Sequence, residues 1–295
     1  MIDVLCIGSV LWDVIGRSAS VMRQGSDVPG RITQIPGGVA LNIAMTLRRF
    51  GMKPALLSAV GRDVLGDVLV AECADMGLDC SLLYRSDDLP TDRYMAVEGA
   101  NGLIAAIADA HSLEAADDKI LRPLTDGRLG CASDPYRGLI ALDGNLTETL
   151  LGKISRDPAF AAADLRVAPA SPGKAERLMP FVTRPGAVLY VNREEAGILC
   201  QAEFPDAETA AAALVARGAK RALVTDGGGP SADADATGVV SEPPPEVLVT
   251  RVTGAGDTFM AAHMAAEAGG ADRQAALHRA LRAAARYVSG ETPHD

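Results

Sequence analysis

The sequence predicts an α/β fold with a mainly parallel sheet and helices on both of its faces. Two observations support this: short apolar runs typical of buried strands recur along the chain, and helical patterns lie between them. The chain has 295 residues, 48% of them hydrophobic, and can bury the core that such a fold needs. Strands are expected at 4–7, 55–60, 138–142, 165–168, 187–191 and 222–225, and helices at 37–50, 66–76 and 208–217.

The first strand and the first helix show these patterns clearly. The apolar run Val4–Ile7 ends at Gly8, as in a central parallel strand that is followed by a loop. Apolar residues then recur on one helical face from 39 to 50, and Gly51 ends the helix. The later strands and helices repeat this alternation, which predicts strand–helix units that build one parallel sheet.

Two segments interrupt the alternation. The stretch 17–35 is polar and contains Gly25, Pro29 and Gly30, so it favours short strands over a helix. Between 91 and 108, two apolar runs flank the sequence Gly-Ala-Asn-Gly, which predicts a hairpin. We therefore expect the hairpin to leave the main sheet.

Composition and charge argue against several classes of partner. The formal net charge is −10, whereas proteins that bind DNA or RNA usually present a basic face. The five cysteines are scattered without a Cys-x-x-Cys pair, which favours free thiols in a reducing compartment. No apolar run reaches the roughly 18 residues of a membrane helix, and the first strand lacks the basic flank of a signal peptide. We expect a cytoplasmic protein with no nucleic-acid or membrane partner.

Polar residues gather where the expected strands end. They occupy the segments 8–13, 143–145, 192–195 and 225–229. Ligands of open parallel sheets bind at the carboxyl ends of the strands. The four segments therefore predict one shared binding site.

The segment Thr253-Gly254-Ala255-Gly256-Asp257 has the features of an anion site that also holds a base. Glycines at a helix start let backbone N–H groups approach an anion, and the helix dipole adds positive potential. The segment lacks the third glycine of a dinucleotide fingerprint and the Gly-Lys-Ser/Thr of a Walker A loop. A carboxylate here suits proton abstraction from an alcohol that attacks a phosphate. Alternatively, Asp257 is a helix-terminal residue stabilised by the dipole.

This segment resembles the C-terminal signature of the ribokinase-like, or PfkB-type, carbohydrate kinases. Residues 37–44, Gly-Gly-Val-Ala-Leu-Asn-Ile-Ala, resemble the N-terminal signature of the same family. The resemblance extends over nearly the whole chain. It implies a single domain over 1–295 with a ribokinase-like three-layer α/β/α core, and a small β-sheet lid formed by about 12–35 and 91–108.

The resemblance also implies roles for individual residues in ATP-dependent phosphorylation of a hydroxyl group. Asp257 is the implied general base, and the backbone of Gly254, Ala255 and Gly256 is the implied anion hole. The residues implied to bind the phosphoacceptor are Asp13, Gly37, Gly38, Asn42 and Tyr94.

The implied cofactors are ATP and Mg²⁺. The residues implied to bind the nucleotide are Asn192, Thr225, Gly227, Gly228 and Thr253, and Glu195 is implied to act on Mg²⁺ through water, which suits an ion that keeps several waters. Without the resemblance, Asn192 and Glu195 equally fit a helix cap, and residues 225–228 fit a turn.

Within the family, several segments are most similar to pseudouridine kinases. They are 25–30, 35–39, 142–146, 169–175 and 252–257. Leu41 and Ala168 depart from that subgroup. The favoured reaction converts pseudouridine to pseudouridine 5′-phosphate. The alternatives are another nucleoside or a free sugar such as ribose, fructose or 2-keto-3-deoxygluconate, and a non-catalytic sensor of nucleosides or sugars.

Two further implications concern a cation and a partner chain. Arg251 stands where many family members carry an acidic residue near a monovalent-cation site, which leaves dependence on K⁺ open. The lid sheets of the family often pair between subunits. The resemblance therefore implies a homodimer formed through the lid.

Overall fold

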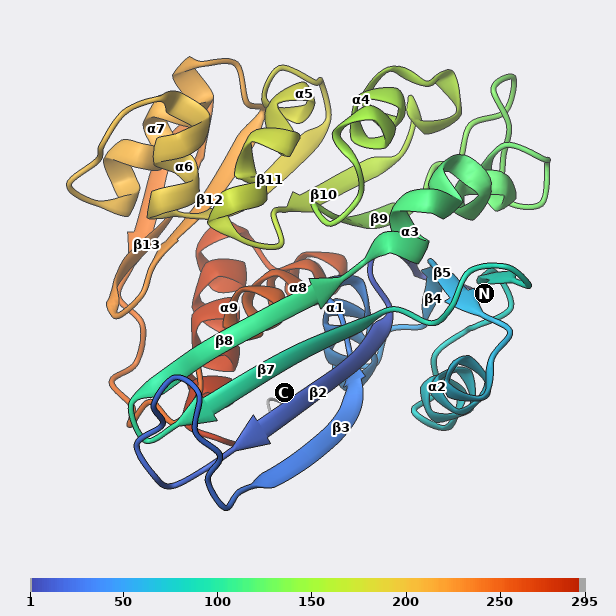
Figure 1. Cartoon of the computed structure of the whole chain (residues 1–295). Coiled ribbons are helices and arrows are strands. Elements are labelled where there is room, and N and C mark those ends of the chain that lie inside the picture. The colour runs from blue at the N-terminus through green and yellow to red at the C-terminus, as the bar shows by residue number, and fades with distance from the viewer. Residues whose placement is uncertain (1, 292–295) are drawn as a thin grey trace.

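The computed structural model describes residues 2–291, which surround an eight-stranded main sheet (Figure 1). The six strands from β12 to β4 in the sheet order run parallel. At one edge, β13 pairs in antiparallel fashion with both β12 and β14. This arrangement confirms the predicted mainly parallel sheet. In spatial order the strands are β14 (Gly238–Glu242), β13 (Gly229–Asp235), β12 (Arg221–Asp226), β11 (Ala187–Asn192), β10 (Asp164–Ala168), β9 (Leu139–Asp143), β1 (Val4–Ile7) and β4 (Pro54–Leu57).

Helices cover both faces of the main sheet, as the alternating pattern predicts (Figure 1). One layer contains α3 (His111–Ala116), α4 (Glu148–Arg156), α5 (Met179–Val182), α6 (Arg193–Cys200) and α7 (Ala207–Ala216). The other contains α1 (Val39–Arg49), α2 (Val64–Asp75), α8 (Ala255–Ala268) and α9 (Arg273–Val288). The described part of the chain also contains three 3₁₀ segments: η1 (Asp117–Leu124), η2 (Pro158–Phe160) and η3 (Pro172–Leu178). Within residues 2–291, no helix is both long and apolar enough to cross a bilayer.

Strand β1 shows why the chain forms three layers. Successive side chains of a strand point to opposite faces of the sheet. Leu5 and Ile7 therefore enter the core beneath α3 to α7, whereas Val4 and Cys6 enter the core beneath α1, α2, α8 and α9. All four side chains are fully buried, and burying each Leu or Ile contributes roughly 1.5–3 kcal/mol.

A separate four-stranded sheet, here called the lid, stands apart from the main sheet (Figure 1). Its strands in spatial order are β3 (Arg31–Gly37), β2 (Leu11–Arg17), β7 (Arg93–Gly99) and β8 (Gly102–Asp109). Strands β2 and β7 pair in parallel, and the two outer pairs are antiparallel. The predicted hairpin between 91 and 108 is formed by β7 and β8, with Gly102 at φ 91° in the turn.

Two features differ from the sequence-based expectation. The expected strand 55–60 is divided: β4 belongs to the main sheet, whereas β5 (Ala59–Gly61) pairs with β6 (Tyr84–Ser86) in a small sheet of its own. The edge strands β13 and β14 were not anticipated. The sequence of β13 alternates Ala with Asp, and a buried aspartate, Asp233, is compensated by ion pairs that its composition does not reveal.

Candidate active site

A broad cleft lies between the lid and the carboxyl ends of the parallel strands. Strand β1 lies between β9 and β4, which both come later in the chain, so the strand order changes direction at β1. Ligands of α/β sheets bind at such switch points. Every site residue expected from the sequence lines this cleft except Gly37, which lies directly behind Asp13. The lining residues among them are Asp13, Gly38, Asn42, Tyr94, Asn192, Glu195, Thr225, Gly227, Gly228, Thr253, Gly254, Ala255, Gly256 and Asp257.

Asp257 is the third residue of α8 and points toward α1. Its Oδ2 atom accepts a hydrogen bond of 2.9 Å from Asn42 Nδ2. Burial raises the pKa of Asp257 to about 7, and the charges of Asp143, Asp13 and Glu195 act in the same direction. The hydrogen bond from Asn42 lowers the pKa and partly offsets these effects. A carboxyl group poised near neutral pH is suited to general base catalysis.

Asp13 lies on β2 at the cleft side of the lid, with Tyr94 beside it on β7. Burial raises the pKa of Asp13 to about 6. Its carboxylate packs so closely on Gly37 that a Cβ atom there would lie 2.1 Å from Asp13 Oδ2. A larger residue at 37 would therefore displace the Asp13 carboxylate from its position.

The carboxyl ends of β1 and β9 are joined by a polar cluster that includes Ser9 and Asp143. Asp143 Oδ2 accepts hydrogen bonds from Ser9 N at 2.8 Å and from Ser9 Oγ at 2.6 Å. Ser9 Oγ in turn accepts from the backbone N–H of Val39 at the start of α1, at 2.9 Å. These contacts hold the start of the helix that carries Asn42. The sequence shows polar residues at 8–13 and 143–145, but nothing in it pairs Ser9 with Asp143.

The loop before α8 has a conformation that requires glycine. Gly254 is the N-cap of α8 at φ 89°, in the left-handed region. A Cβ atom there would also lie 2.5 Å from the hydroxyl of Tyr287 on α9. That hydroxyl donates to the carbonyl oxygen of Thr253 at 2.9 Å. Tyr287 was missed in the sequence because it belongs to a helix more than 30 residues away, and no motif surrounds it.

Arg251 packs against the same tyrosine. Its guanidinium lies 3.9 Å from the centre of the Tyr287 ring, and its Nε donates to the Tyr287 carbonyl oxygen at 2.8 Å. The backbone of Thr250 adds a hydrogen bond of 2.8 Å to Val288. The end of α9 and the loop before α8 are therefore held together from both sides.

Asn192 and Glu195 form a capping box at the start of α6. Asn192 Oδ1 accepts from the Glu195 N–H, and Glu195 Oε2 accepts from the Asn192 N–H, each at 2.8 Å. Glu195 is buried, and desolvation raises its pKa to about 7. The capping role considered from the sequence is thus present, and both residues also line the cleft.

The acidic residues of the cleft suit an ion that is held mainly by phosphate and water. Within residues 2–291, no three His, Cys, Asp or Glu side chains are grouped to form a metal-binding cage. Mg²⁺ in phosphoryl-transfer sites is usually bound by one or two carboxylates, substrate phosphates and water. The cleft carboxylate of Glu195 fits that mode of binding.

Thr225, Gly227 and Gly228 lie at the end of β12, in the tight turn that leads to β13. Gly227 has φ 57°, and the turn faces the cleft. Next to it, Arg193 Nε and Asp226 Oδ1 form an ion pair at 2.7 Å. The turn and α6 are therefore fixed to each other at the edge of the cleft formed by β11 and β12.

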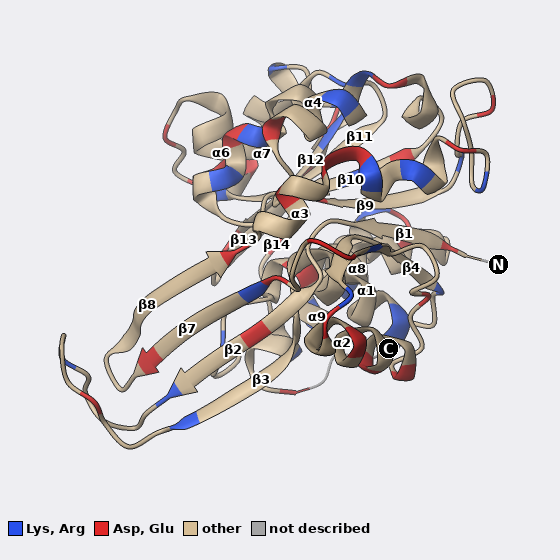
Figure 2. Cartoon of the chain, turned by 45° about the vertical axis from the view of Figure 1, so that its right-hand side comes forward, with Lys and Arg blue, Asp and Glu red and all other residues tan. Residues whose placement is uncertain are grey.

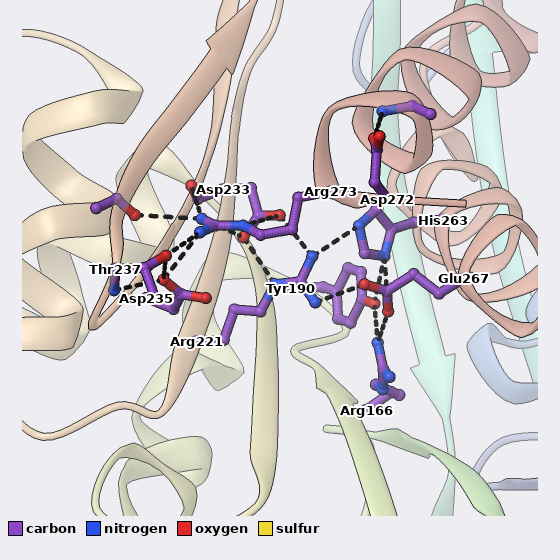
Figure 3. A network of polar contacts seen from close by, with 12 residues as sticks. Arg166, Tyr190, Arg221, Asp233, Asp235, Thr237, His263, Glu267, Asp272 and Arg273 are labelled. Atoms are coloured by element: carbon purple, nitrogen blue, oxygen red, sulfur yellow. Dashed lines mark hydrogen bonds and ion pairs between the residues drawn. The ribbon is translucent and has the colours of Figure 1, made fainter. Parts of the chain in front are cut away.

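A buried polar network fixes α8 against the main sheet (Figure 3). Glu267 of α8 accepts hydrogen bonds from Arg166 of β10 and Arg221 of β12. His263 Nδ1, also on α8, lies 2.9 Å from the hydroxyl of Tyr190 on β11. Burial lowers the pKa of His263 to about 4, so the imidazole is neutral. The network sets the position of the helix whose first turn carries Asp257.

Comparison with known sequences identifies the family to which this fold belongs. The sequence pattern described as pfkB family carbohydrate kinase matches residues 1–292, and the chain belongs to this family. It is 27% identical over 173 residues to a pseudouridine kinase of Arabidopsis thaliana and 36% identical over 109 residues to one of Escherichia coli. These alignments cover 58% and 36% of this chain, but only 44% and 34% of the two relatives.

Solved structures agree with this fold. A carbohydrate kinase from Agrobacterium tumefaciens superimposes with a TM-score of 0.81 at 25% identity, covering 100% of this chain and 93% of that one. A ribokinase of Arabidopsis thaliana complexed with ribose and ATP gives a TM-score of 0.77 at 18% identity, covering 98% of this chain and 93% of that one. At 18% identity, the similarity to the ribokinase shows the fold alone.

Proposed function

We propose that the protein transfers the γ-phosphate of ATP to a hydroxymethyl group of a nucleoside or sugar. The observation that supports this most strongly is the position of Asp257, a carboxyl group with a raised pKa in the first turn of α8, directly after the loop of Gly254. A helix N-terminus attracts phosphate, and a carboxyl group beside it with a pKa of about 7 can accept the proton of an attacking hydroxyl. Family membership supports the same reaction class.

In this reaction Asp257 accepts the proton of the acceptor hydroxyl as its oxygen attacks the phosphorus. The backbone N–H groups of Gly254 and Gly256 stabilise the negative charge of the transferred group, whereas the N–H of Ala255 donates to the Val252 carbonyl oxygen at 3.0 Å and shapes the loop. Asn42 holds the Asp257 carboxylate in place through its hydrogen bond. The lid excludes water from the cleft, which limits hydrolysis of ATP.

The nucleotide occupies the half of the cleft formed by β11 and β12. Thr225, Gly227 and Gly228 contact the nucleotide, while Asn192 and Thr253 contact its phosphates. Mg²⁺ neutralises phosphate charge when it is bound, and Glu195 would hold one of its waters. The buried position of Glu195 in a fixed capping box supports such an indirect role.

The acceptor occupies the half of the cleft under the lid, and pseudouridine is its best candidate. Asp13 and Asn42 bind the ribose hydroxyls there, with Gly37 and Gly38 allowing close approach and Tyr94 beside Asp13. Beyond them, the cleft side of the lid carries an apolar surface suited to a nucleobase, which a free sugar would leave uncovered. Its side chains are Ile15, Ile35, Ala96 and Leu103.

Two alternatives predict different behaviour. A kinase for a free sugar would prefer ribose, fructose or 2-keto-3-deoxygluconate, and a non-catalytic sensor would bind its ligand without consuming ATP. We would measure ADP formation with pseudouridine, uridine, adenosine, ribose, fructose and 2-keto-3-deoxygluconate. The proposal predicts the highest kcat/KM with pseudouridine and a 5′-phosphate product. Preference for a free sugar refutes the nucleoside assignment, and ligand-dependent thermal stabilisation without turnover refutes the kinase assignment.

The outer face of the lid supports the homodimer. Ile32, Met95 and Ile107 project from three of its strands with exposed fractions of 77%, 46% and 61%, on strands that are mainly uncharged (Figure 2). An exposed apolar surface of this kind favours pairing with a second copy of the lid. Light scattering should give a dimer for the wild type and a monomer for Ile107→Glu. A monomeric wild type refutes the pairing.

A further inference from the structure

One cationic side chain in the cleft has no role in the reaction described so far. Lys174 lies in η3, just after β10, and its half-buried side chain lines the cleft. Its ammonium group donates to the side-chain oxygen of Asn145. Within residues 2–291 this neutral amide is its hydrogen-bond partner, and an ammonium has three N–H donors. Lys174 therefore keeps donors available to a ligand.

The other cations of the cleft are already engaged or lie in solvent. Arg17 forms an ion pair of 2.6 Å with Glu98, and Arg193 forms one of 2.7 Å with Asp226. Arg251 packs on Tyr287, and Arg49 is exposed. Lys174 is thus the half-buried cation that is available for an anionic ligand.

The sheet order places Lys174 at the boundary between the two halves of the cleft. Strand β10 lies between β9 and β1 on one side and β11 and β12 on the other. Asp13 follows β1, on the acceptor side, whereas Asn192 and Thr225 end β11 and β12, on the nucleotide side. A phosphoryl group that moves from nucleotide to acceptor must cross this boundary.

The surroundings of Lys174 also prepare it to bind an anion. Asn145 Nδ2 donates to Ser9 Oγ at 3.0 Å and to Asp143 Oδ2 at 3.2 Å, which orients the amide oxygen toward the lysine. Burial and the nearby charge of Arg177 lower the pKa of Lys174. A desolvated ammonium beside another cation gains more from an incoming anion than a solvated one does.

We propose that Lys174 binds the non-bridging oxygens of the γ-phosphate and stabilises the phosphoryl group during its transfer. In this step the acceptor oxygen bonds to phosphorus while the bond to the β–γ bridging oxygen breaks, and its electron pair leaves with ADP. Asp257 receives the acceptor proton. Lys174 only donates hydrogen bonds and keeps its proton. This role rests on the proposed kinase reaction.

The decisive variants are Lys174→Gln and Lys174→Arg, with Lys153→Met, a surface lysine paired with Asp118, as the control. Gln keeps a donor for Asn145 but removes the charge, whereas Arg keeps the charge. We expect Lys174→Gln to lower kcat on the order of 10²–10³-fold with the KM for the acceptor within threefold. The kcat of Lys174→Arg should be at least tenfold higher than that of Lys174→Gln, and the kcat of Lys153→Met should match that of the wild type.

Binding measurements separate this role from the proposed function. Calorimetry with Mg-ATP and Mg-ADP requires no turnover, so it tests Lys174 even if the wild type phosphorylates none of the acceptors. Lys174→Gln should weaken Mg-ATP at least fivefold and leave Mg-ADP within twofold, because only ATP has the γ-phosphate. An unchanged kcat in an active enzyme, or equal affinities for Mg-ATP in the wild type and the Gln variant, overturns the proposal. If the Gln variant does not fold, as judged by circular dichroism, the same binding comparison with Lys174→Met decides. A loss of at least fivefold that is confined to Mg-ATP supports the proposal, whereas unchanged affinity for Mg-ATP or equal losses for Mg-ATP and Mg-ADP overturn it.

Discussion

The side-chain amide of Asn42 on α1 donates a hydrogen bond of 2.9 Å to the carboxylate of Asp257 on α8, across a sequence separation of 215 residues. Asn42 comes from the N-terminal signature of the family and Asp257 from the C-terminal one. The contact therefore brings the two signatures together in one cleft. It also links α1 to the proposed base.

Replacing Asn42 should change the pH dependence of the reaction. Its hydrogen bond lowers the pKa of Asp257, so Asn42→Leu removes that effect and raises the pKa further above 7. Because Asp257 must be ionised to accept a proton, the acidic limb of the kcat/KM profile should move to higher pH by about one unit, and kcat/KM at pH 7 should fall. A lower plateau with an unmoved acidic limb would contradict this role.

Removing the Tyr287 hydroxyl should disturb the anion-binding loop. Tyr287→Phe loses the hydrogen bond to the Thr253 carbonyl and keeps the ring under Arg251. A typical hydrogen bond contributes about 1 kcal/mol, so we expect kcat to fall roughly fivefold to tenfold with little change in the KM for the acceptor. Tyr136→Phe, outside the cleft lining, is the matched control. Equal activity of both variants would show that the hydroxyl does not position the loop.

Arg251 predicts little dependence on monovalent cations. Its guanidinium donates to the backbone carbonyl oxygens of Tyr287 and Glu291, which are then occupied by a fixed positive charge. At constant ionic strength, kcat/KM should agree within twofold in KCl, NaCl and tetramethylammonium chloride. Activation by K⁺ of more than fivefold would show that a cation site persists beside Arg251.

The network around Glu267 should dominate the stability of the packing between α8 and the sheet. Glu267→Ala leaves Arg166 and Arg221 with a missing partner, and breaking a buried ion pair costs about 3–5 kcal/mol. The pKa of Glu267 is lowered to about 2, so its contribution is fully present above pH 5 and is lost as the pH falls toward 2. Urea unfolding at pH 7 measures the loss, with the exposed Glu203→Ala as the control. A change below 1 kcal/mol would contradict the structural role.

Much of the fold could be predicted from local patterns. The parallel strands are short apolar runs because both of their faces are buried, and Val4–Ile7 shows this directly. The hairpin of the lid follows from its Gly-Ala-Asn-Gly turn. Strand β13 could not be predicted, because its buried Asp233 depends on Arg221 and Arg273, which lie elsewhere in the chain.

The candidate site was predictable where residues belong to signatures and strand ends, and hidden where a contact joins distant segments. Asp257 and Asn42 lie in motifs, so the sequence places both in a site. Tyr287 and Lys174 acquire their surroundings only when α9 and η3 meet the cleft. The pKa values depend on the same three-dimensional crowding, since burial is their largest cause.

The raised pKa of Asp257 also predicts a cost in stability. The folded protein holds this proton up to about pH 7, whereas an unfolded aspartate loses it near its ordinary value of 3.8, so stability falls as the pH rises between these values. Asp257→Asn removes that cost. Its Tm should therefore exceed that of the wild type at pH 8, with a smaller difference at pH 5.

The most direct test of the account is the turnover of Asp257→Asn beside its affinity for Mg-ATP. The amide retains the shape of the carboxylate but cannot accept the hydroxyl proton. We expect kcat to fall on the order of 10²–10⁴-fold, while calorimetry gives an Mg-ATP affinity within threefold of the wild type. Turnover at the wild-type rate by this variant would contradict Asp257 as the general base.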